Sequence, residues 1–276
     1  MKTQIDWQQI LSQCKINVCT SIKPFLKTIS EPQPNLGIGA GGDTMKPMDL
    51  AAETAILDTL KQHGVSFTLI SEESGVKKFG AKPEEYFVTV DPIDGSTNFM
   101  HGLPFYCCSI AVSRKPTLND VFAGMVADLA HDTTYIAFEG KGAYRDGKKI
   151  ETSKTTSLEE AVVGLDLNTY KVKELVPKLT PLIAKTKHIR HFGANALELC
   201  YVANGMTDAF VDIRGKLRTT DVAAGFLILK EAGGIVTNPE NEPFNVELDP
   251  KKTMSFIASG NMEIHKKIVG LVKSAC

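Results

Sequence analysis

The residues best suited to chemistry lie in one short segment, residues 91–99, which reads Asp-Pro-Ile-Asp-Gly-Ser-Thr-Asn-Phe. It holds two carboxylates, a turn and two hydroxyls. The apolar run before it, residues 86–90, predicts a buried strand, so we expect Asp91 at its carboxyl end and Asp94 in the loop beyond, where α/β proteins place ligands. Because desolvating an unpaired charge is costly, the two acids need a partner. A hard divalent cation such as Mg²⁺, which binds carboxylates, waters and phosphate oxygens, meets that need.

A second acidic segment, residues 219–234, predicts a helix over residues 221–232 with its start and stop signals. Thr219 or Thr220 is expected to cap its start, and Gly233-Gly234 supplies a left-handed stop. The helix dipole favours Asp221 in the first turn, which would explain this acid without any ligand. Together with the acids at two predicted strand ends, it completes a set of four candidate metal ligands: Glu72, Asp91, Asp94 and Asp221.

A phosphate ligand would need N–H donors as well as metal, and two predicted helix starts offer them. The first start comprises Gly95, Ser96 and Thr97, and the second comprises Gly193, Ala194 and Asn195. Each start is also consistent with an ordinary helix that binds nothing. Two metal ions about 3.5–4 Å apart would activate a water and stabilise the leaving oxygen of a phosphate ester.

Composition narrows the class of protein. The 276 residues suit one large domain or two closely packed halves, and a hydrophobic content of 43% is sufficient for a core. The formal charge of -1 argues against a general nucleic-acid or membrane-surface binder. No apolar run reaches membrane-spanning length, and the first residues do not resemble a signal peptide. The six cysteines form no Cys-x-x-Cys pair, so we expect reduced thiols in a cytoplasmic protein.

The order of periodic segments predicts layered α/β architecture. Helices are expected over residues 5–26, 48–63, 172–184, 194–202, 221–232 and 262–272. Strands are expected over residues 66–71, 86–90, 106–112, 121–126, 134–138, 162–165, 209–212 and 256–258. The glycine-rich residues 37–43 are expected to form a mobile loop, and residues 32–43 are expected to order when metal binds. The predicted organisation is one compact unit, in which residues 1–150 carry the metal-binding motif and residues 151–276 complete the active site.

Three acidic blocks carry a family resemblance: residues 71–74 (Ser-Glu-Glu-Ser), residues 91–99 and residues 221–234. Their order and spacing resemble the signature blocks of the inositol monophosphatase family, and the similarity runs from Lys46 to the C-terminal strand and helix. Residues 46–53 are most similar to the archaeal branch. In that branch, inositol monophosphatase and fructose-1,6-bisphosphatase activities can share one site.

The resemblance implies an αβαβα layered sandwich, usually a homodimer, that hydrolyses phosphomonoesters with two or three Mg²⁺ per site, for which Mn²⁺ can substitute, and that is sensitive to lithium. The implied metal ligands are Glu72, Asp91, Asp94, Asp221 and the carbonyl of Ile93. Glu73 would be a lesser ligand. The implied catalytic residues are Asp49, Ser96 and Glu72, with Asp49 holding a further metal or its waters. Asp49 would also pair with the hydroxyl of Ser96 to orient or deprotonate the attacking water.

Departures from the family pattern concern the substrate more than the reaction. Ser96 stands where many members have threonine, Thr220 where animal and bacterial members usually have tryptophan, and Asn195 where they have alanine. Asp212 falls near the acid that contacts an inositol hydroxyl in the animal enzymes. The basic residues after it, Arg214, Lys216 and Arg218, would meet the second phosphate of fructose 1,6-bisphosphate, form a solvated basic loop, or contact another subunit.

Other phosphatase chemistries fit less well. Cys108 and Arg114 have the Cys-x₅-Arg spacing of cysteine phosphatases, but the residues between them predict a buried strand. The spacing of Asp91 and Asp94 is one residue too long for an aspartyl-phosphate phosphatase, which favours direct attack by water.

The leading interpretation is a Mg²⁺-dependent phosphomonoesterase for inositol 1-phosphate and/or fructose 1,6-bisphosphate. The alternatives are a 3′-phosphoadenosine 5′-phosphate phosphatase and a non-catalytic protein that binds a phospho-ligand or metal.

Overall fold

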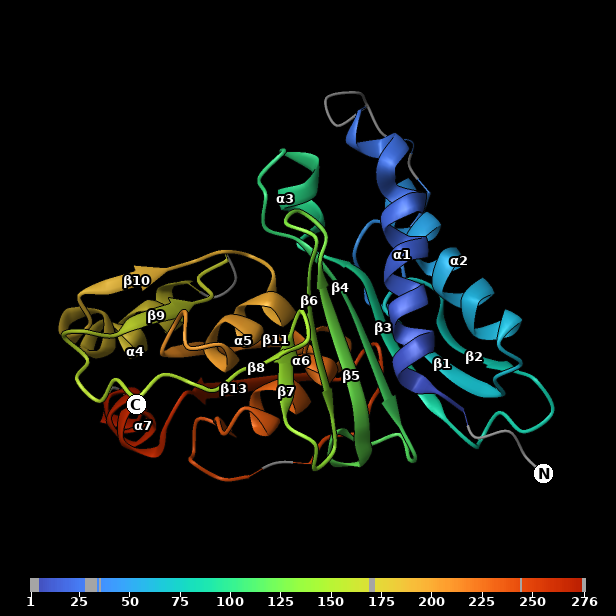
Figure 1. Cartoon of the computed structure of the whole chain (residues 1–276). Coiled ribbons are helices and arrows are strands. Elements are labelled where there is room, and N and C mark those ends of the chain that lie inside the picture. Colours follow the sequence, from blue (N-terminus) through green and yellow to red (C-terminus); the bar gives the residue numbers. More distant parts are fainter. Residues whose placement is uncertain (1–4, 28–33, 35, 169–171, 244, 275–276) are drawn as a thin grey trace.

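Two β-sheets alternate with three layers of helices in the computed structural model, which describes residues 5–27, 34, 36–168, 172–243 and 245–274 (Figure 1). Helices α1 and α2 cover the outer face of the first sheet, α5 and α6 lie between the sheets, and α4 and α7 cover the outer face of the second. The predicted αβαβα sandwich is therefore confirmed.

In the part of the chain that the structure describes, the first sheet has eight strands in the order β2-β1-β3-β4-β5-β6-β7-β8. Only β1 and β3 pair in parallel, and the other neighbours are antiparallel. The strands are β1 (Phe67–Ser71), β2 (Gly75–Phe79), β3 (Phe87–Asp94), β4 (Cys107–Ser113), β5 (Val121–Asp128), β6 (Thr133–Phe138), β7 (Ala143–Arg145) and β8 (Lys148–Lys149).

The second sheet, as far as the described residues form it, has five strands in the order β10-β9-β11-β13-β12. Strands β10, β9 and β11 run parallel, whereas β13 is antiparallel to both of its neighbours. The strands are β9 (Val162–Leu165), β10 (His188–Arg190), β11 (Ala209–Arg218), β12 (Ile235–Thr237) and β13 (Thr253–Ser259). The division of the chain into residues 1–150 and 151–276 stays a prediction.

The helices match the predicted segments to within a few residues. They are α1 (Trp7–Leu26), α2 (Pro47–Gln62), α3 (Ser96–Met100), α4 (Val172–Lys185), α5 (Asn195–Ala203), α6 (Thr219–Glu231) and α7 (Met262–Ser274), with a 3₁₀ turn at Leu118–Asp120. The expected cap of α6 is wrong, because Thr219 and Thr220 lie inside the helix and Arg218 occupies the capping position. The expected stop is confirmed, since Gly233 has a φ of 94°.

Helix α6 is buried on all sides, as its position between two sheets requires. Glycines allow this packing. A Cβ on Gly124 of β5 would lie 3.2 Å from the backbone of Ala224, and one on Gly225 would lie 2.8 Å from the side chain of Leu199 in α5. The close fit holds the first turn of α6, with Asp221, against the end of the first sheet.

The glycine-rich loop, residues 37–43, makes backbone hydrogen bonds within itself and to the residues after β1; its expected mobility stays a prediction. Residues 38 and 44 form an antiparallel bridge, and Gly39 N–H donates to the carbonyl of Asp43 at 2.8 Å. The N–H groups of Ala40 and Gly41 donate to the carbonyls of Glu73 and Glu72 at 2.9 and 2.7 Å. Residues 28–33 and 35, which precede or adjoin this loop, lie outside the described residues.

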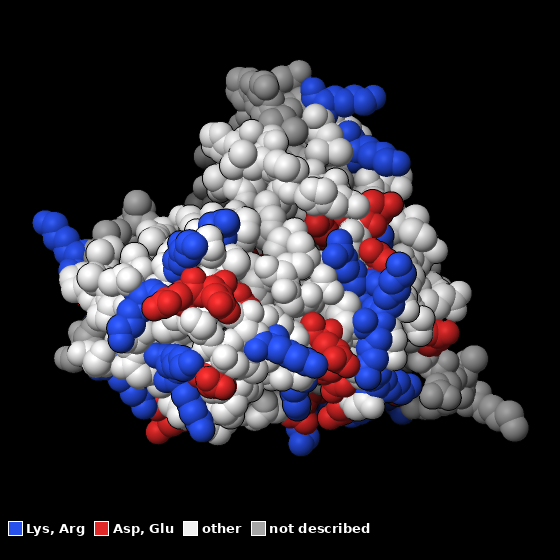
Figure 2. Space-filling view, turned by 60° about the vertical axis from the view of Figure 1, so that its left-hand side comes forward, with Lys and Arg blue, Asp and Glu red and all other residues white. Residues whose placement is uncertain are grey.

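The charged surface is mixed in sign. Figure 2 shows lysines and arginines interspersed with aspartates and glutamates over the face that it presents, in keeping with the formal charge of -1. Among the described helices, none is long and apolar enough to cross a membrane.

Candidate metal and phosphate site

The carboxyl end of β3 carries a bulge that separates two acids. Asp91 pairs with Ser109 of β4 and Asp94 pairs with Cys107, so β3 contains one residue more than its partner over this stretch. Pro92 lies in the bulge, where its missing N–H does not break the ladder. The structure therefore corrects the prediction that Asp94 lies in a loop, because Asp94 is the last residue of the strand. The extra residue changes the direction of the chain between the two carboxylates.

Two further acids reach Asp91 from neighbouring elements. Glu72 follows β1, which runs parallel to β3, and its N–H donates to the carbonyl of Val90 at 3.3 Å. Asp221 comes from the first turn of α6. One carboxylate oxygen from each of Glu72, Asp91 and Asp221 lies within 4.8 Å of the others. The structure thus brings together three of the four predicted acidic ligands in one group, with oxygen donors of the kind that Mg²⁺ prefers.

The acids of this cluster are held in an environment that opposes their ionisation. Burial, followed by the charge of Glu72, raises the pKa of Asp91 well above its usual range. Burial also raises the pKa of Asp221, and burial with the adjacent charge of Asp221 raises that of Glu72. A divalent cation would offset this repulsion, so the donor set fits a metal site. Ligation by the carbonyl of Ile93 stays a prediction.

Asp94 joins the first sheet to α5. Its Oδ2 accepts the N–H of Ala196 at 2.6 Å, and the N–H of Asn195 also supports the carboxylate. The N–H of Gly193 donates to Glu198 Oε1 at 3.0 Å. The prediction that residues 193–195 cradle a ligand is therefore wrong for the N–H groups of Gly193 and Asn195, which serve carboxylates of the protein. Burial, and then the charge of Asp221, raise the pKa of Asp94 to about 7.

Helix α3 begins where the sequence predicts. Gly95 has a φ of 85°, and a Cβ there would lie 2.9 Å from the carbonyl oxygen of Phe105 and 3.0 Å from the Cβ of Ala194. Glycine is therefore required at this turn. The N–H groups of Ser96 and Thr97 lie in the first turn, where a helix provides no acceptor for them.

Ser96 has a different partner from the expected one. The Nζ of Lys46 donates to Ser96 Oγ at 2.6 Å, and the predicted hydrogen bond between Asp49 and Ser96 is not formed. Asp49 Oδ2 instead accepts the N–H of Lys46 at 3.3 Å, and its Oδ1 is buried without a partner. Burial, followed by the charge of Glu73, raises the pKa of Asp49 to about 7. The expected bond is not formed because Ser96 Oγ instead accepts a hydrogen bond from the ammonium of Lys46, at the start of α2.

Arg218 lies directly against the acidic cluster. Its guanidinium contacts Glu72 at 2.7 Å, Asp43 at 2.8 Å and Asp221 at 3.3 Å. A Cβ on Gly41 would lie 2.7 Å from its Nη1, so glycine in the loop permits the approach. The side chain is 16% exposed, which rules out the solvated-loop alternative for this residue.

Arg214 is enclosed by two buried acids. Its Nη2 lies 2.5 Å from Asp166 and 2.6 Å from Asp212, and its side chain is 9% exposed. Its Nε also donates to Asp212 Oδ1 at 3.0 Å. The predicted role of Asp212 and Arg214 in binding substrate is therefore not supported, since each satisfies the other. Asp166 was missed in the sequence, where a single acid after a short strand is an ordinary occurrence.

The cysteine-phosphatase alternative is excluded by the position of its two residues. Cys108 is fully buried in β4, and burial raises the pKa of its thiol well above the usual range. The guanidinium of Arg114 lies over the ring of Phe122, 4.2 Å from its centroid. The thiol and the cation therefore form no anion-binding loop.

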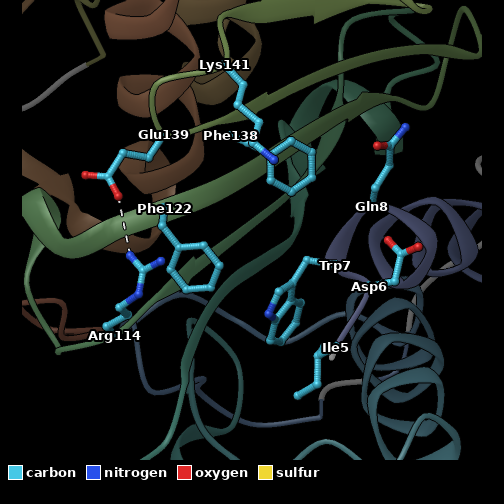
Figure 3. A pocket seen from close by; sticks show the side chains of 9 residues that line it. All are labelled: Ile5, Asp6, Trp7, Gln8, Arg114, Phe122, Phe138, Glu139 and Lys141. Carbon is cyan, nitrogen blue, oxygen red and sulfur yellow. Dashed lines mark hydrogen bonds and ion pairs between the residues drawn. The ribbon is translucent and has the colours of Figure 1, made fainter. Parts of the chain in front are cut away.

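A pocket of about 560 Å³ lies between the start of α1 and the strands β5 and β6. Figure 3 shows the side chains that line it. Arg114 and Phe122 line it, and Arg114 contacts Glu139 at 3.3 Å. Arg114 follows the carboxyl end of β4, whereas Cys107, which pairs with Asp94, is at the amino end. The pocket is thus at the opposite end of the sheet from the candidate site.

Comparisons with known proteins agree with this geometry. A model of the inositol monophosphatase family matches residues 11–275. The chain is 34% identical over 271 residues to the fructose-1,6-bisphosphatase/inositol-1-monophosphatase of Methanothermobacter thermautotrophicus, with 95% of each protein covered. It is 36% identical over 271 residues to the bifunctional NADP phosphatase/NAD kinase of Methanococcus maripaludis, where the match covers 91% of this chain and 46% of that protein. A solved inositol monophosphatase-fructose 1,6 bisphosphatase superposes with a TM-score of 0.84 at 28% identity, covering 99% of this chain and 100% of the other.

Proposed function

Because the chain belongs to the inositol monophosphatase family, we propose that it is a Mg²⁺-dependent phosphomonoesterase that hydrolyses inositol 1-phosphate, fructose 1,6-bisphosphate or both. The observation that carries this proposal is the group of three carboxylates, from Glu72, Asp91 and Asp221, whose oxygens lie within 4.8 Å of one another. Such a group offers the oxygen ligands that Mg²⁺ or Mn²⁺ prefers, and we propose two or three ions per site, as the family resemblance implies. Asp94 and the carbonyl of Ile93 would complete the ligand set.

Groups around the cluster would bind the phosphate and orient the attacking water. Bound metal would supply positive charge to the phosphoryl group and lower the pKa of the attacking water. The N–H groups of Ser96 and Thr97 would donate to phosphoryl oxygens, because they lack acceptors within α3. Asp49 would orient the attacking water through the Oδ1 that has no partner in the protein. Asp94 would hold the start of α5 against the site through Ala196.

Arg218 is a better candidate than Arg214 for a second phosphate. Arg214 is already shared by two buried acids. Arg218 contacts Glu72 and Asp221, and metal bound to those carboxylates would neutralise them and free the guanidinium for another anion. In this proposal the turnover of fructose 1,6-bisphosphate depends on Arg218 more than the turnover of inositol 1-phosphate does.

A second candidate substrate is the 2′-phosphate of NADP. Two curated relatives with NADP phosphatase in their names are 36% and 34% identical to this chain. The chemistry would be the same phosphomonoester hydrolysis, with a nucleotide in place of a sugar. The 3′-phosphoadenosine 5′-phosphate phosphatase interpretation differs from it only in the nucleotide, and the non-catalytic interpretation requires that no ester be hydrolysed.

The test is phosphate release from these four esters with and without Mg²⁺, in the wild type and in Asp221→Asn. We expect Mg²⁺-dependent release that falls by at least about 100-fold in Asp221→Asn, because one ligand oxygen no longer carries charge. Asp58→Asn is the matched control, since this α2 carboxylate is 58% exposed and its loss should leave the rate unchanged. Absence of Mg²⁺-dependent release from all four esters would favour the non-catalytic interpretation.

We further propose a homodimer in the cytoplasm, as the family resemblance implies. The cysteines at positions 14, 19, 107, 108 and 200 are all free thiols, which suits a reducing compartment. Sedimentation equilibrium of the purified protein measures the oligomeric state, and a monomer at all concentrations would contradict this part of the proposal.

A further inference from the structure

Lys46 carries a half-buried ammonium group that the family resemblance assigns to no task. The residue occupies the capping position of α2, and its Nζ donates to Ser96 Oγ at 2.6 Å. Among the described residues, no ion pair within 4.0 Å includes Lys46. An ammonium has three protons to donate, so two remain after the bond to Ser96. The side chain is therefore a cation beside the proposed phosphate site that no carboxylate has neutralised by direct contact.

The hydrogen bond has a fixed direction, which constrains what Ser96 can do. An ammonium can donate but cannot accept, so Ser96 Oγ is the acceptor. The single proton of the hydroxyl is then free to be donated to another group. A relay that passes a proton from water through Ser96 to Asp49 would need a direct contact between these two side chains. That contact is not formed, because Asp49 Oδ1 has no partner and Oδ2 accepts the N–H of Lys46.

We propose that Lys46 is a positioning residue that holds the Ser96 hydroxyl as a donor toward a phosphoryl oxygen of the substrate, with its two remaining protons directed to the same anion. The inference rests on the proposed phosphomonoesterase function and names the groups that recognise its phosphate. Ser96 is then a phosphate-binding donor and takes no part in removing a proton from water. Charge-assisted bonds of this kind are shorter and stronger than neutral ones, and they act on the oxygens where charge develops.

The test compares Lys46→Met, Lys46→Arg, Ser96→Ala and the double variant Lys46→Met/Ser96→Ala. Three quantities are measured in the presence of Mg²⁺: kcat, KM, and the Kd for inorganic phosphate by calorimetry. Lys46→Met and Ser96→Ala should each lower kcat by about 100-fold, as loss of one donor to a developing charge does, and weaken phosphate binding by about 10-fold. Because Lys46 acts partly through Ser96, the double variant should lose less than the product of the single losses. Lys46→Arg should recover part of the phosphate affinity, since it keeps the charge.

Lys61→Met is the control, because Lys61 lies in the same helix with a side chain that is 50% exposed. It should bind phosphate as the wild type does, and thermal unfolding of every variant checks that the fold is intact. The proposal is overturned if Lys46→Met binds phosphate as tightly as the wild type, or if the two single losses multiply fully. Phosphate affinity is measured without turnover. A wild type that releases no phosphate from any ester but shows the predicted affinities would contradict the proposed function and still support the role of Lys46.

Discussion

At the scale of single residues, Arg218 places a permanent positive charge against carboxylates that are proposed to hold metal. It contacts Glu72 at 2.7 Å and Asp221 at 3.3 Å, and it also reaches Asp43 in the glycine-rich loop. In the metal-free protein, burial raises the pKa of Glu72 and Asp221, and the charge of this guanidinium acts against that rise. Metal and Arg218 therefore stabilise the same carboxylates.

Because metal and Arg218 stabilise the same carboxylates, the loss of unfolding free energy in Arg218→Met should depend on Mg²⁺. Without Mg²⁺ the variant should lose about 3 kcal/mol of unfolding free energy, because a buried ion pair loses one partner. With Mg²⁺ the loss should be smaller, since the metal replaces the missing charge. The measurement is urea unfolding with and without saturating Mg²⁺. Arg114→Met is the control: its side chain is 62% exposed, so we expect a loss below about 1 kcal/mol under both conditions. Equal losses in Arg218→Met with and without metal would contradict the overlap.

At the scale of elements, α6 depends on glycine for its position between the sheets. A Cβ on Gly225 would lie 2.8 Å from Leu199 Cδ1 and 2.9 Å from Leu199 Cβ. Gly225→Ala should therefore lower the unfolding free energy by about 1–3 kcal/mol through overpacking, even though alanine is the better helix former. The matched control is Gly270→Ala in α7, where nothing lies within 4 Å, and it should stabilise by about 0.5–1 kcal/mol. Urea unfolding of both variants measures these changes. Stabilisation in Gly225→Ala would contradict the prediction, because it would show that α6 and Leu199 can shift to accept the added methyl group.

Elements with a strong local pattern are the ones that the sequence predicts well. The apolar run before Asp91 predicts β3, and apolar spacing predicts α2 and α6, because each pattern is contained within the element. The bulge at Pro92 escapes prediction, since it depends on the register with β4. The acidic cluster is foreseen because strand ends and a helix start converge in this fold. The Lys46–Ser96 bond joins residues 50 apart in the chain, and no local pattern indicates it.

Local sequence patterns also fail to predict the partners of the buried charged side chains in residues 151–276. The sequence leaves Arg214 as a contact to a second phosphate, part of a solvated loop or a subunit contact, but β11, which carries it, runs beside β9, and Asp166 directly follows β9. Glu198 lies in α5 and is buried. Its Oε1 accepts the N–H of Gly193, and its Oε2 has no hydrogen-bond partner. The partner of each of these side chains depends on which elements become neighbours, and that is a property of the tertiary structure.

At the scale of the whole molecule, the candidate site draws its residues from both sheets and from the helix layer between them. Asp91 and Asp94 belong to the first sheet, Arg218 ends β11 of the second, and Asp221 comes from the helix layer between them. Asp94 also binds the start of α5 through Ala196. Charge at this site therefore acts on the packing of the entire chain, so metal and pH should change global stability.

The sign of the pH effect follows from the raised pKa values. Burial raises the pKa of Asp49 and Asp94 to about 7 and that of Glu198 to about 8, from ordinary values of 3.8 and 4.5. A group whose folded pKa is raised contributes stability that is complete below its unfolded pKa and is lost as pH rises through the folded value. Buried His265 acts in the other direction, because burial lowers its pKa to about 4. Its effect falls between pH 4 and 6.5 and adds no slope above 6.5.

The metal-free protein should therefore become less stable as pH rises from about 6.5 to about 8, the window that contains the raised pKa values of Asp49, Asp94 and Glu198. Saturating Mg²⁺ should flatten or reverse this decline, because metal binds the ionised carboxylates and competes with protons for them. Urea unfolding at several pH values, with and without Mg²⁺, measures both slopes. Glu198→Gln separates the contributions: Glu198 is outside the group of three converging carboxylates, so this variant should remove part of the metal-free decline and keep the response to Mg²⁺. A metal-free profile that is flat or rises over this range would mean that the buried acids are already ionised and neutralised by the cations around them.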